Sequence, residues 1–420
     1  MTKDALFSVL SDKNRDLSFS SGRTYGDKGR LLSAAEKFVS CFPDDEEIRL
    51  FSSPGRTEIG GNHTDHNGGR VLAAAVDADI IAAASPRMDG EIRIFSEGFG
   101  FIHAKVEITE PDEALFGSSE ALVQGVSSVL ASRGFTVGGF DACIESRVLP
   151  GSGLSSSAAF ELLIAEIQNA FFNKGKIDAL TLAIASQEAE NRYFGKPCGL
   201  MDQTACASGG FVGIDFIDPS KPLVTPVDFD FEKSGLALII TDTRASHAGL
   251  TPHYAAIPAE MKAVAAFFGK PVLRGLTREE LLASVPALRQ KVSDRAILRA
   301  MHFISEDERA TRQFEALKAG DTAEFLRLVR ESGASSRNLL QNITAPESNS
   351  QSVALALAVS DAVLGGEGAS RVHGGGFAGT VQAFVPIYLK GGYCAAMNRI
   401  FGEGSAVCLG IRRDGADEIS

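Results

Sequence analysis

The segment Leu149–Leu163, "LPGSGLSSSAAFELL", places a Gly/Ser-rich turn directly before a long apolar stretch. Glycines let a backbone approach a ligand closely, and a helix that begins with small residues leaves its unpaired N–H groups open to an anion. The segment therefore predicts either a phosphate-binding turn or an ordinary capped helix start. It is not the Walker loop of classical NTPases, because it contains no lysine. The residues expected at a phosphate are Gly151, Gly153, Leu154, Ser155, Ser156, Ser157 and Ala158.

The rest of the chain alternates strand-like and helix-like blocks. Residues 71–109 carry β-branched runs separated by turn residues, and helical patterns follow at 112–134, 156–175 and 180–195. Two apolar strands, 209–216 and 234–243, flank a polar stretch, and beyond it the chain is mostly helical. With 420 residues, 44% of them hydrophobic, the sequence predicts an α+β fold in two lobes, residues 1–220 and 221–420. A small-molecule site is expected in the cleft between the lobes.

Charge and cysteine content exclude several classes of function. The net charge of −12 argues against a nucleic-acid-binding surface. The longest apolar tract is broken by Asp77 and Asp79, so no membrane span is expected. Six scattered cysteines without a CxxC spacing, and the lack of a signal-peptide pattern, predict a cytoplasmic protein. We expect a monomer or a small homo-oligomer.

Four segments, in order, resemble the galactokinase family of the GHMP small-molecule kinases. "PGRTEIGGNHTDHNGG" is similar to the first motif, P-G-R-V-N-L-I-G-E-H-T-D-Y-N-G-G, and "GSGLSSSAAFE" to the ATP-binding loop. "KPCGLMDQ" resembles P-C-G-I-M-D-Q, and "SRVHGGGFAGT" resembles the third, glycine-rich motif. The resemblance implies a two-lobed GHMP fold and transfer of the ATP γ-phosphate to the anomeric hydroxyl of a sugar, most simply galactose.

The resemblance also assigns roles to individual residues. Asp202 matches the catalytic aspartate and Arg56 the first-motif arginine, whose charge can keep a carboxylate ionised and offset charge on the transferring phosphoryl group. Mg²⁺ would accompany ATP, with Ser155, Ser156 and Glu190 as candidate ligands. The expected sugar-binding residues are Glu58, Asn62, His63, Asp65, Tyr254 and Gly375.

The first motif departs from the family at two positions. Glu58 stands where the family has Asn, and Asn62 stands where the family has the Glu that contacts the C6 hydroxyl. Since Asn62 removes a negative charge, the pocket is expected to take galactose or a C6 variant such as a uronic acid. In the third motif, His373 replaces a Thr.

Three functions stay open on the sequence alone. The first is a galactokinase. The second is a kinase for a related sugar, such as galacturonate, another uronic acid, an amino sugar or arabinose. The third is a sensor that binds ATP and sugar without turnover. The complete Ser/Ala loop and Asp202 argue for an enzyme.

Overall fold

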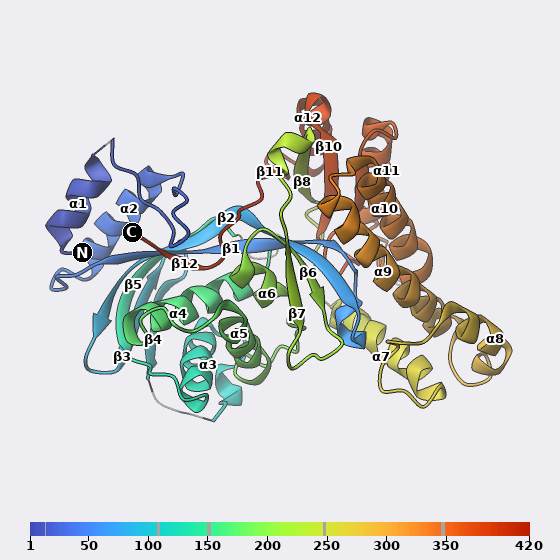
Figure 1. Ribbon diagram of the computed structural model, residues 1–420, viewed down its shortest axis with the longest axis horizontal. Helices are drawn as coiled ribbons and strands as arrows, with labels where there is room; N and C mark the ends of the chain where they lie inside the picture. The colour runs from blue at the N-terminus through green and yellow to red at the C-terminus, as the bar shows by residue number, and fades with distance from the viewer. Residues whose placement is uncertain (13, 107–109, 149–152, 247–248, 346–348) are drawn as a thin grey trace.

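An eight-stranded mixed sheet forms the centre of the protein (Figure 1). The structure is a computed structural model that describes residues 1–420 except 13, 107–109, 149–152, 247–248 and 346–348. The strand order is β12-β1-β2-β5-β3-β4, and β6 pairs with β2 while β7 pairs with β6. Its strands are β1 (Arg49–Gly60), β2 (Arg70–Arg87), β3 (Glu91–Ser96), β4 (Gly100–Lys105), β5 (Gly139–Ser146), β6 (Phe211–Asp215), β7 (Leu223–Val227) and β12 (Asp417–Ile419).

Helices cover both faces of this sheet because residues on β2 alternate between them. Ile80, Ala82 and Ala84 face one hydrophobic cluster, whereas Ile81 and Ala83 face another. The first cluster includes buried residues of four helices, α3 (Ser119–Ser132), α4 (Ser156–Phe172), α5 (Ala179–Arg192) and α6 (Met201–Ser208). The second contains α1 (Lys3–Ser11) and α2 (Lys28–Cys41) on the other face.

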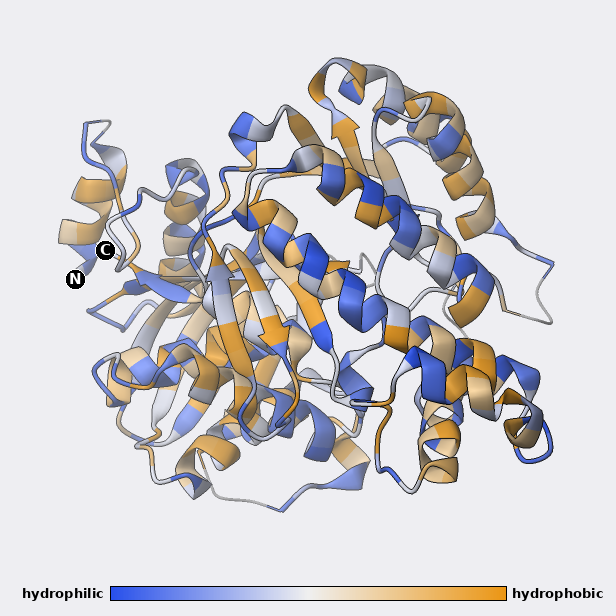
Figure 2. Cartoon of the chain, turned by 45° about the vertical axis from the view of Figure 1, so that its right-hand side comes forward, coloured by the Kyte–Doolittle hydropathy of each residue, from blue (hydrophilic) through white to orange (hydrophobic). Residues whose placement is uncertain are grey.

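A second, four-stranded antiparallel sheet has the order β11-β8-β10-β9. Helices α10, α11 and α12 pack against it, and α7, α8 and α9 extend to one side (Figure 1). Hydrophobic residues dominate the strands, and the outer helices carry hydrophilic residues on the side turned to the viewer (Figure 2). The elements of this part are β8 (Leu236–Asp242), β9 (Ala369–Val372), β10 (Thr380–Pro386), β11 (Ala406–Leu409), α7 (Thr251–Phe267), α8 (Arg278–Leu288), α9 (Asp294–Lys318), α10 (Thr322–Ser335), α11 (Ser352–Leu364) and α12 (Lys390–Phe401).

Five short helical turns complete the described elements. They are η1 (Asp65–Asn67), η2 (Glu113–Leu115), η3 (Glu232–Ser234), the π-helical turn η4 (Ser336–Leu340) and η5 (Ile387–Leu389). The expected α+β architecture of mixed sheets and helices is confirmed. Two strands beyond residue 220 join the first sheet: β7 pairs with β6, and β12 pairs with β1. The division at residue 220 stays a prediction.

The first motif is a strand up to Gly60 and a turn from there to η1. β1 runs from Arg49 to Gly60, with register shifts between Pro54 and Arg56 and between Glu58 and Gly60. Gly60 and Gly61 both face protein, the first the side chain of Gln313 and the second the backbone of Arg70. A Cβ on Gly61 would lie 2.3 Å from the carbonyl oxygen of Arg70, so this glycine permits two backbone segments to pack closely.

Candidate active site

The two predicted catalytic residues, Arg56 and Asp202, are in direct contact. Arg56 Nε donates to Asp202 Oδ1 over 2.8 Å, and a second guanidinium nitrogen donates to the carbonyl of Gly153 over 2.6 Å. The hydroxyl of Ser155 donates to the other oxygen of Asp202. One arginine thus joins β1, the Gly/Ser segment and the start of α6, although 146 residues separate Arg56 from Asp202.

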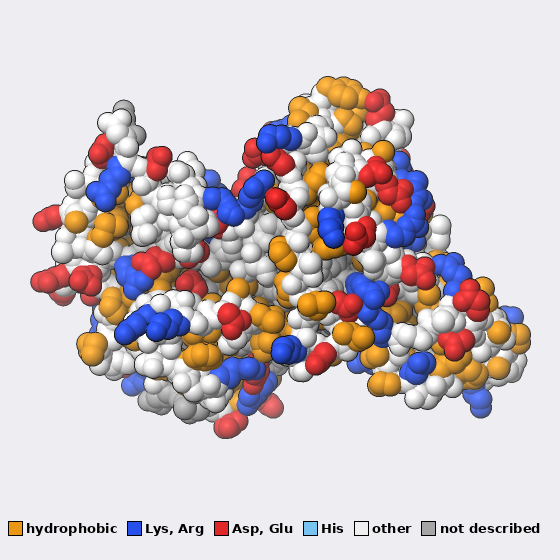
Figure 3. Space-filling view, in the orientation of Figure 1, with side chains coloured by type: hydrophobic (Ala, Val, Ile, Leu, Met, Phe, Trp, Pro, Cys, Tyr) orange, Lys and Arg blue, Asp and Glu red, His pale blue; other side chains and the backbone are white. Residues whose placement is uncertain are grey.

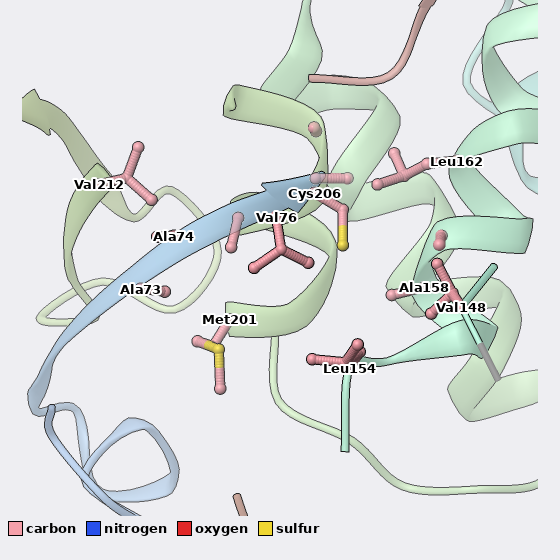
Figure 4. Close-up of a cluster of buried hydrophobic side chains, with 14 of the residues drawn as sticks. Ala73, Ala74, Val76, Val148, Leu154, Ala158, Leu162, Met201, Cys206 and Val212 are labelled. Carbon is pink, nitrogen blue, oxygen red and sulfur yellow. The ribbon is translucent and has the colours of Figure 1, made fainter. Parts of the chain in front are cut away.

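Buried neighbours fix the positions of Ser155 and Asp202. Each follows an apolar residue, Leu154 and Met201 respectively, that is anchored in the main hydrophobic cluster (Figure 4). The backbone N–H of Arg56 also donates to the carbonyl of Leu154 over 3.0 Å. Ser155 then turns the chain into α4 with left-handed backbone angles, φ 58° and ψ 61°. The site is therefore held by the core and not by its own polar contacts alone.

Asp202 is ionised at neutral pH. Burial raises the pKa of its carboxyl, but the charge and hydrogen bond of Arg56, the Ser155 hydroxyl and the charge of Lys196 together bring it below the ordinary value. The Asp202 side chain keeps 27% exposure, whereas Arg56 keeps only 8%. A ligand can therefore reach the carboxylate while the arginine stays behind it.

The remaining residues of the Gly/Ser segment lie at the start of α4. Ser156, Ser157 and Ala158 form its first turn, with Ala158 fully buried. At Gly153, φ is +74° and a Cβ would lie 2.6 Å from the hydroxyl oxygen of Thr380, so the second sheet approaches the segment closely. Gly151 lies outside the described residues.

Predicted sugar-binding residues from two segments, the first motif and α7, contact the third-motif turn. His63 Nε2 lies 3.0 Å from the carbonyl oxygen of Gly375; because a carbonyl only accepts, this nitrogen carries the proton. Tyr254, on α7, donates its hydroxyl to the carbonyl of Gly376 over 2.9 Å. Burial lowers the pKa of His63 to about 4, so its ring is neutral at pH 7.

Asp65, the remaining predicted sugar-binding residue, lies beside the segment that leads to Asp202. A Cβ on Gly199 would come within 2.1 Å of an Asp65 carboxylate oxygen. Only glycine at position 199 allows this approach, so the "PCGLMD" segment and the first motif pack directly together. The two carboxylates, Asp65 and Asp202, are thereby brought to one region of the molecule.

Asn62 is fully buried, and its side-chain amide is occupied by protein groups. Its Nδ2 donates to Glu58 Oε1 over 3.0 Å and to the carbonyl of Gly374 over 2.8 Å. Its Oδ1 accepts from Asn342 Nδ2 over 2.9 Å and from the Ser336 hydroxyl over 3.3 Å. In this structure Asn62 binds the third-motif turn to the first motif; its contact with a sugar stays a prediction.

Glu58, the other exchanged residue, forms a buried ion pair. Arg371 on β9 donates to Glu58 Oε1 over 2.6 Å and to the carbonyl of Ile59 over 2.7 Å. The exchange of Glu and Asn therefore keeps one carboxyl group in this region and places it at the neighbouring, hydrogen-bonded position 58. Asn62 itself carries no charge, and the carboxyl group of Glu58 lies 3.0 Å from its amide nitrogen.

Glu190 contacts the nucleotide segment, but four donors surround its carboxylate. The Ser157 hydroxyl and the Lys196 ammonium donate to Oε1 over 2.9 and 2.8 Å. The Cys198 thiol and the Gln203 amide donate to Oε2 over 3.0 and 2.8 Å. A carboxylate offers about four lone-pair sites, so a metal ion would have to displace a donor to be bound directly.

The sequence did not single out several buried polar partners of the site. Arg371, Asn342 and Gln382 are fully buried and bind first-motif residues from the second half of the chain. Their spacing carries no motif, although an arginine within an apolar strand is a usable signal because a buried charge needs a partner. His373, expected near the substrate, is held between the hydroxyls of Thr57 and Thr380, 3.0 Å from each.

The described residues contain no group of three or more His, Cys, Asp or Glu side chains arranged to hold a metal ion. Among them, no helix is long and apolar enough to cross a membrane. A surface groove of about 990 Å³, between the segment that joins α1 to α2 and the segment 226–232 (Figure 3), is lined by none of the predicted site residues.

Comparison with protein families gives two matches. Residues 36–86 match the galactokinase galactose-binding signature, and residues 121–210 match the GHMP kinase N-terminal domain. The first contains Arg56 and the exchanged pair, and the second contains the Gly/Ser segment, Glu190 and Asp202. A galactokinase from Streptomyces coelicolor is 32% identical over 356 residues, which are 84% of this chain and 88% of the relative.

Solved structures agree with these matches. A Lactococcus lactis galactokinase complexed with galactose superposes with a TM-score of 0.77 at 26% identity, over 92% of this chain and 99% of that one. A Methanococcus jannaschii mevalonate kinase, at 15% identity, shares the fold with a TM-score of 0.62 over 87% and 98% of the two chains. The fold, the two family matches and the extent of the Streptomyces similarity together establish that the chain belongs to the galactokinase family of GHMP kinases.

Proposed function

We propose that this protein is an ATP-dependent galactokinase that transfers the γ-phosphate of ATP to the anomeric hydroxyl of galactose. The observation that carries the proposal is the contact of Arg56, Asp202 and Ser155, which unites the first motif, the nucleotide segment and the "GLMDQ" segment. The similarity to a galactokinase that binds galactose, over nearly the whole of both chains, supports this choice of sugar.

The proposed roles follow from the charges of these groups. Phosphoryl transfer needs in-line positioning and compensation of charge more than covalent help from the protein. Asp202, ionised and partly exposed, would orient the sugar hydroxyl and accept its proton. Arg56 would hold Asp202 ionised and offset charge on the transferring group. The N-terminus of α4, with Ser155, Ser156 and Ser157, would hold the phosphates.

Mg²⁺ would enter with ATP, since kinases bind this ion largely through substrate phosphates, water and one or two protein oxygens. The hydroxyls of Ser155 and Ser156, at the start of α4, fit this requirement. Glu190, with four donors on its carboxylate, fits better as a group that orients Ser157 than as a direct ligand. The bound ion would neutralise phosphate charge.

The uronic acid alternative rests on the absence of a carboxylate at position 62. Because Glu58 supplies one within 3.0 Å and Asn62 itself is buried, the exchange presents no new cationic or open site to a C6 carboxylate. This geometry favours galactose over galacturonate. No observation favours a sensor without turnover over an enzyme.

The test is ADP release by the purified protein with Mg²⁺-ATP and each of galactose, N-acetylgalactosamine, arabinose, galacturonate and glucuronate. We expect turnover on galactose, and loss of at least about a thousandfold in kcat for Asp202→Asn, which keeps the side-chain shape but removes the charge. Turnover on another sugar with none on galactose would reject galactose as substrate. ATP binding without turnover on any sugar would reject the enzyme.

A further inference from the structure

Lys196 lies beside the nucleotide segment, although no motif includes it. Its ammonium donates to Glu190 Oε1 over 2.8 Å, and the same oxygen accepts the hydroxyl of Ser157 over 2.9 Å. Ser157 belongs to the first turn of α4. Lys196 and Ser157 therefore bind the same oxygen of Glu190, which places the lysine charge close to the helix N-terminus where the phosphates are proposed to bind.

The side chain of Lys196 is more exposed than that of Arg56 and is held by fewer hydrogen bonds. Arg56 is 8% exposed and is fixed by Asp202 and the carbonyl of Gly153. The Lys196 side chain is 59% exposed, whereas its partner Glu190 is 2% exposed. An ammonium has three donors on a flexible stem, and Glu190 takes one of them. Lys196 can therefore turn toward an incoming anion without breaking the packing around it.

The charged groups around the nucleotide segment are consistent with binding of phosphate by Lys196. Gln203 bridges the carboxyl groups of Glu161 and Glu190 at 3.0 and 2.8 Å, and burial together with the charge of Glu190 raises the pKa of Glu161 well above its ordinary value. Arg56 is committed to Asp202, and ATP adds several negative charges. Lysine is a common binder of phosphate as a point charge.

We propose that Lys196 is a further phosphate-binding residue of this site, which moves from Glu190 to the β- and γ-phosphates when ATP binds. The inference rests on the proposed function, because it places ATP at the start of α4. It differs from a purely structural role, in which Lys196 would only neutralise Glu190. The two roles predict different behaviour when both charges are removed.

Binding of ATP and of AMP, measured by calorimetry without sugar, distinguishes these roles. Lys196→Met keeps the aliphatic part of the side chain and removes the charge. We expect it to weaken ATP binding about tenfold, which corresponds to the loss of one charged hydrogen bond. AMP binding should not change, since AMP lacks the β- and γ-phosphates. Lys196→Arg should recover most of the ATP affinity. Lys233→Met removes an exposed lysine that pairs with Asp230 and should match the wild type.

The double variant Lys196→Met/Glu190→Gln decides between the two roles. If Lys196 binds phosphate, the double variant stays as weak for ATP as Lys196→Met. Recovery of ATP affinity in the double variant, equal losses for ATP and AMP, or wild-type affinity in Lys196→Met would each overturn the inference. Turnover of galactose by the wild type is measured separately, so a wrong sugar assignment would leave this comparison unaffected.

Discussion

The side-chain amide of Asn62 donates to the carboxylate of Glu58 over 3.0 Å, inside a region that solvent does not reach. Arg371 binds the same Glu58 oxygen over 2.6 Å. The family motif that the first motif resembles, P-G-R-V-N-L-I-G-E-H-T-D-Y-N-G-G, has these two residue types at the opposite positions. The contact explains why both positions differ together: one carboxylate is kept beside one amide, and a single change would leave two carboxylates or none.

We expect Asn62→Glu to destabilise the protein by roughly 3 kcal/mol, because it buries a second carboxylate at hydrogen-bond distance from Glu58. The double variant Glu58→Asn/Asn62→Glu restores one carboxylate and one amide, and it should recover at least half of the loss. Urea denaturation of the two single variants and the double variant gives the coupling between the positions. Additive losses would contradict the pairing.

Arg56→Gln should move the acid limb of the pH–rate profile upward. Burial raises the pKa of Asp202, and the charge and hydrogen bond of Arg56 are the strongest of the influences that lower it, so this pKa should rise without the arginine. Since activity needs ionised Asp202, kcat/KM should begin to fall at a higher pH in the variant than in the wild type when the pH is lowered.

A profile for Arg56→Gln with the wild-type acid limb would show that Asp202 does not depend on this charge. Arg56→Lys serves as the control. It keeps a positive charge, but it lacks the planar guanidinium whose two nitrogens bind Asp202 and the carbonyl of Gly153. We expect its acid limb to lie close to that of the wild type, even though its kcat is reduced.

Much of the fold follows from periodicity, but β1 does not. Strands β2, β3 and β4 occupy the predicted region up to Lys105, whereas residues 107–109 lie outside the described residues. Gly134, with φ +88°, follows α3 and its C-cap Arg133. β1 was not recognised because its polar residues are buried. Glu58, for example, is satisfied by Arg371, 313 residues further along. A pattern of hydrophobicity cannot reveal a strand whose polar groups find such distant partners.

The candidate site was predicted where a motif marks a residue, and missed where tertiary contact alone places it. Arg56, Asp202 and Ser155 were expected and lie together. Asn342 and Lys196 were not expected, because an ordinary Asn before a loop and an ordinary Lys beside a Pro look like solvated residues. Only packing brings Asn342 to Asn62 and Lys196 to Glu190.

Gly61→Ala should be far more destabilising than Gly22→Ala. Both glycines have φ near +85°, which costs an alanine about 1–2 kcal/mol. At Gly22 nothing lies within 4 Å of the added Cβ, whereas at Gly61 it would lie 2.3 Å from the carbonyl oxygen of Arg70. The difference between the two variants in urea denaturation therefore measures backbone crowding, and we expect at least about 2 kcal/mol. Equal losses would mean that the contact relaxes freely.

Glu306 should stabilise the protein in a manner that depends on pH. It is fully buried and accepts from the N–H of Gly61 over 3.2 Å and from the Ser332 hydroxyl over 2.6 Å, beside Arg309. Burial raises its pKa, but the nearby charges of Arg309, His302 and Arg371 outweigh burial and bring the pKa to about 2. A carboxyl whose pKa is lower in the folded state contributes stability above its unfolded pKa, which is 4.5, and loses it as the pH falls toward 2.

Glu306→Gln should therefore cost roughly 3 kcal/mol at pH 7, a value that follows from a pKa difference of about two units or more. The difference in the free energy of unfolding between wild type and variant should decrease as the pH falls below about 4.5. Urea denaturation at intervals between pH 3 and pH 7 measures this difference. Glu324→Gln is the matched control, because Glu324 also pairs with arginines but its side chain is 31% exposed, so that water screens the charges. If the two variants behave alike at every pH, burial of Glu306 beside Gly61 contributes nothing to the stability of the first motif.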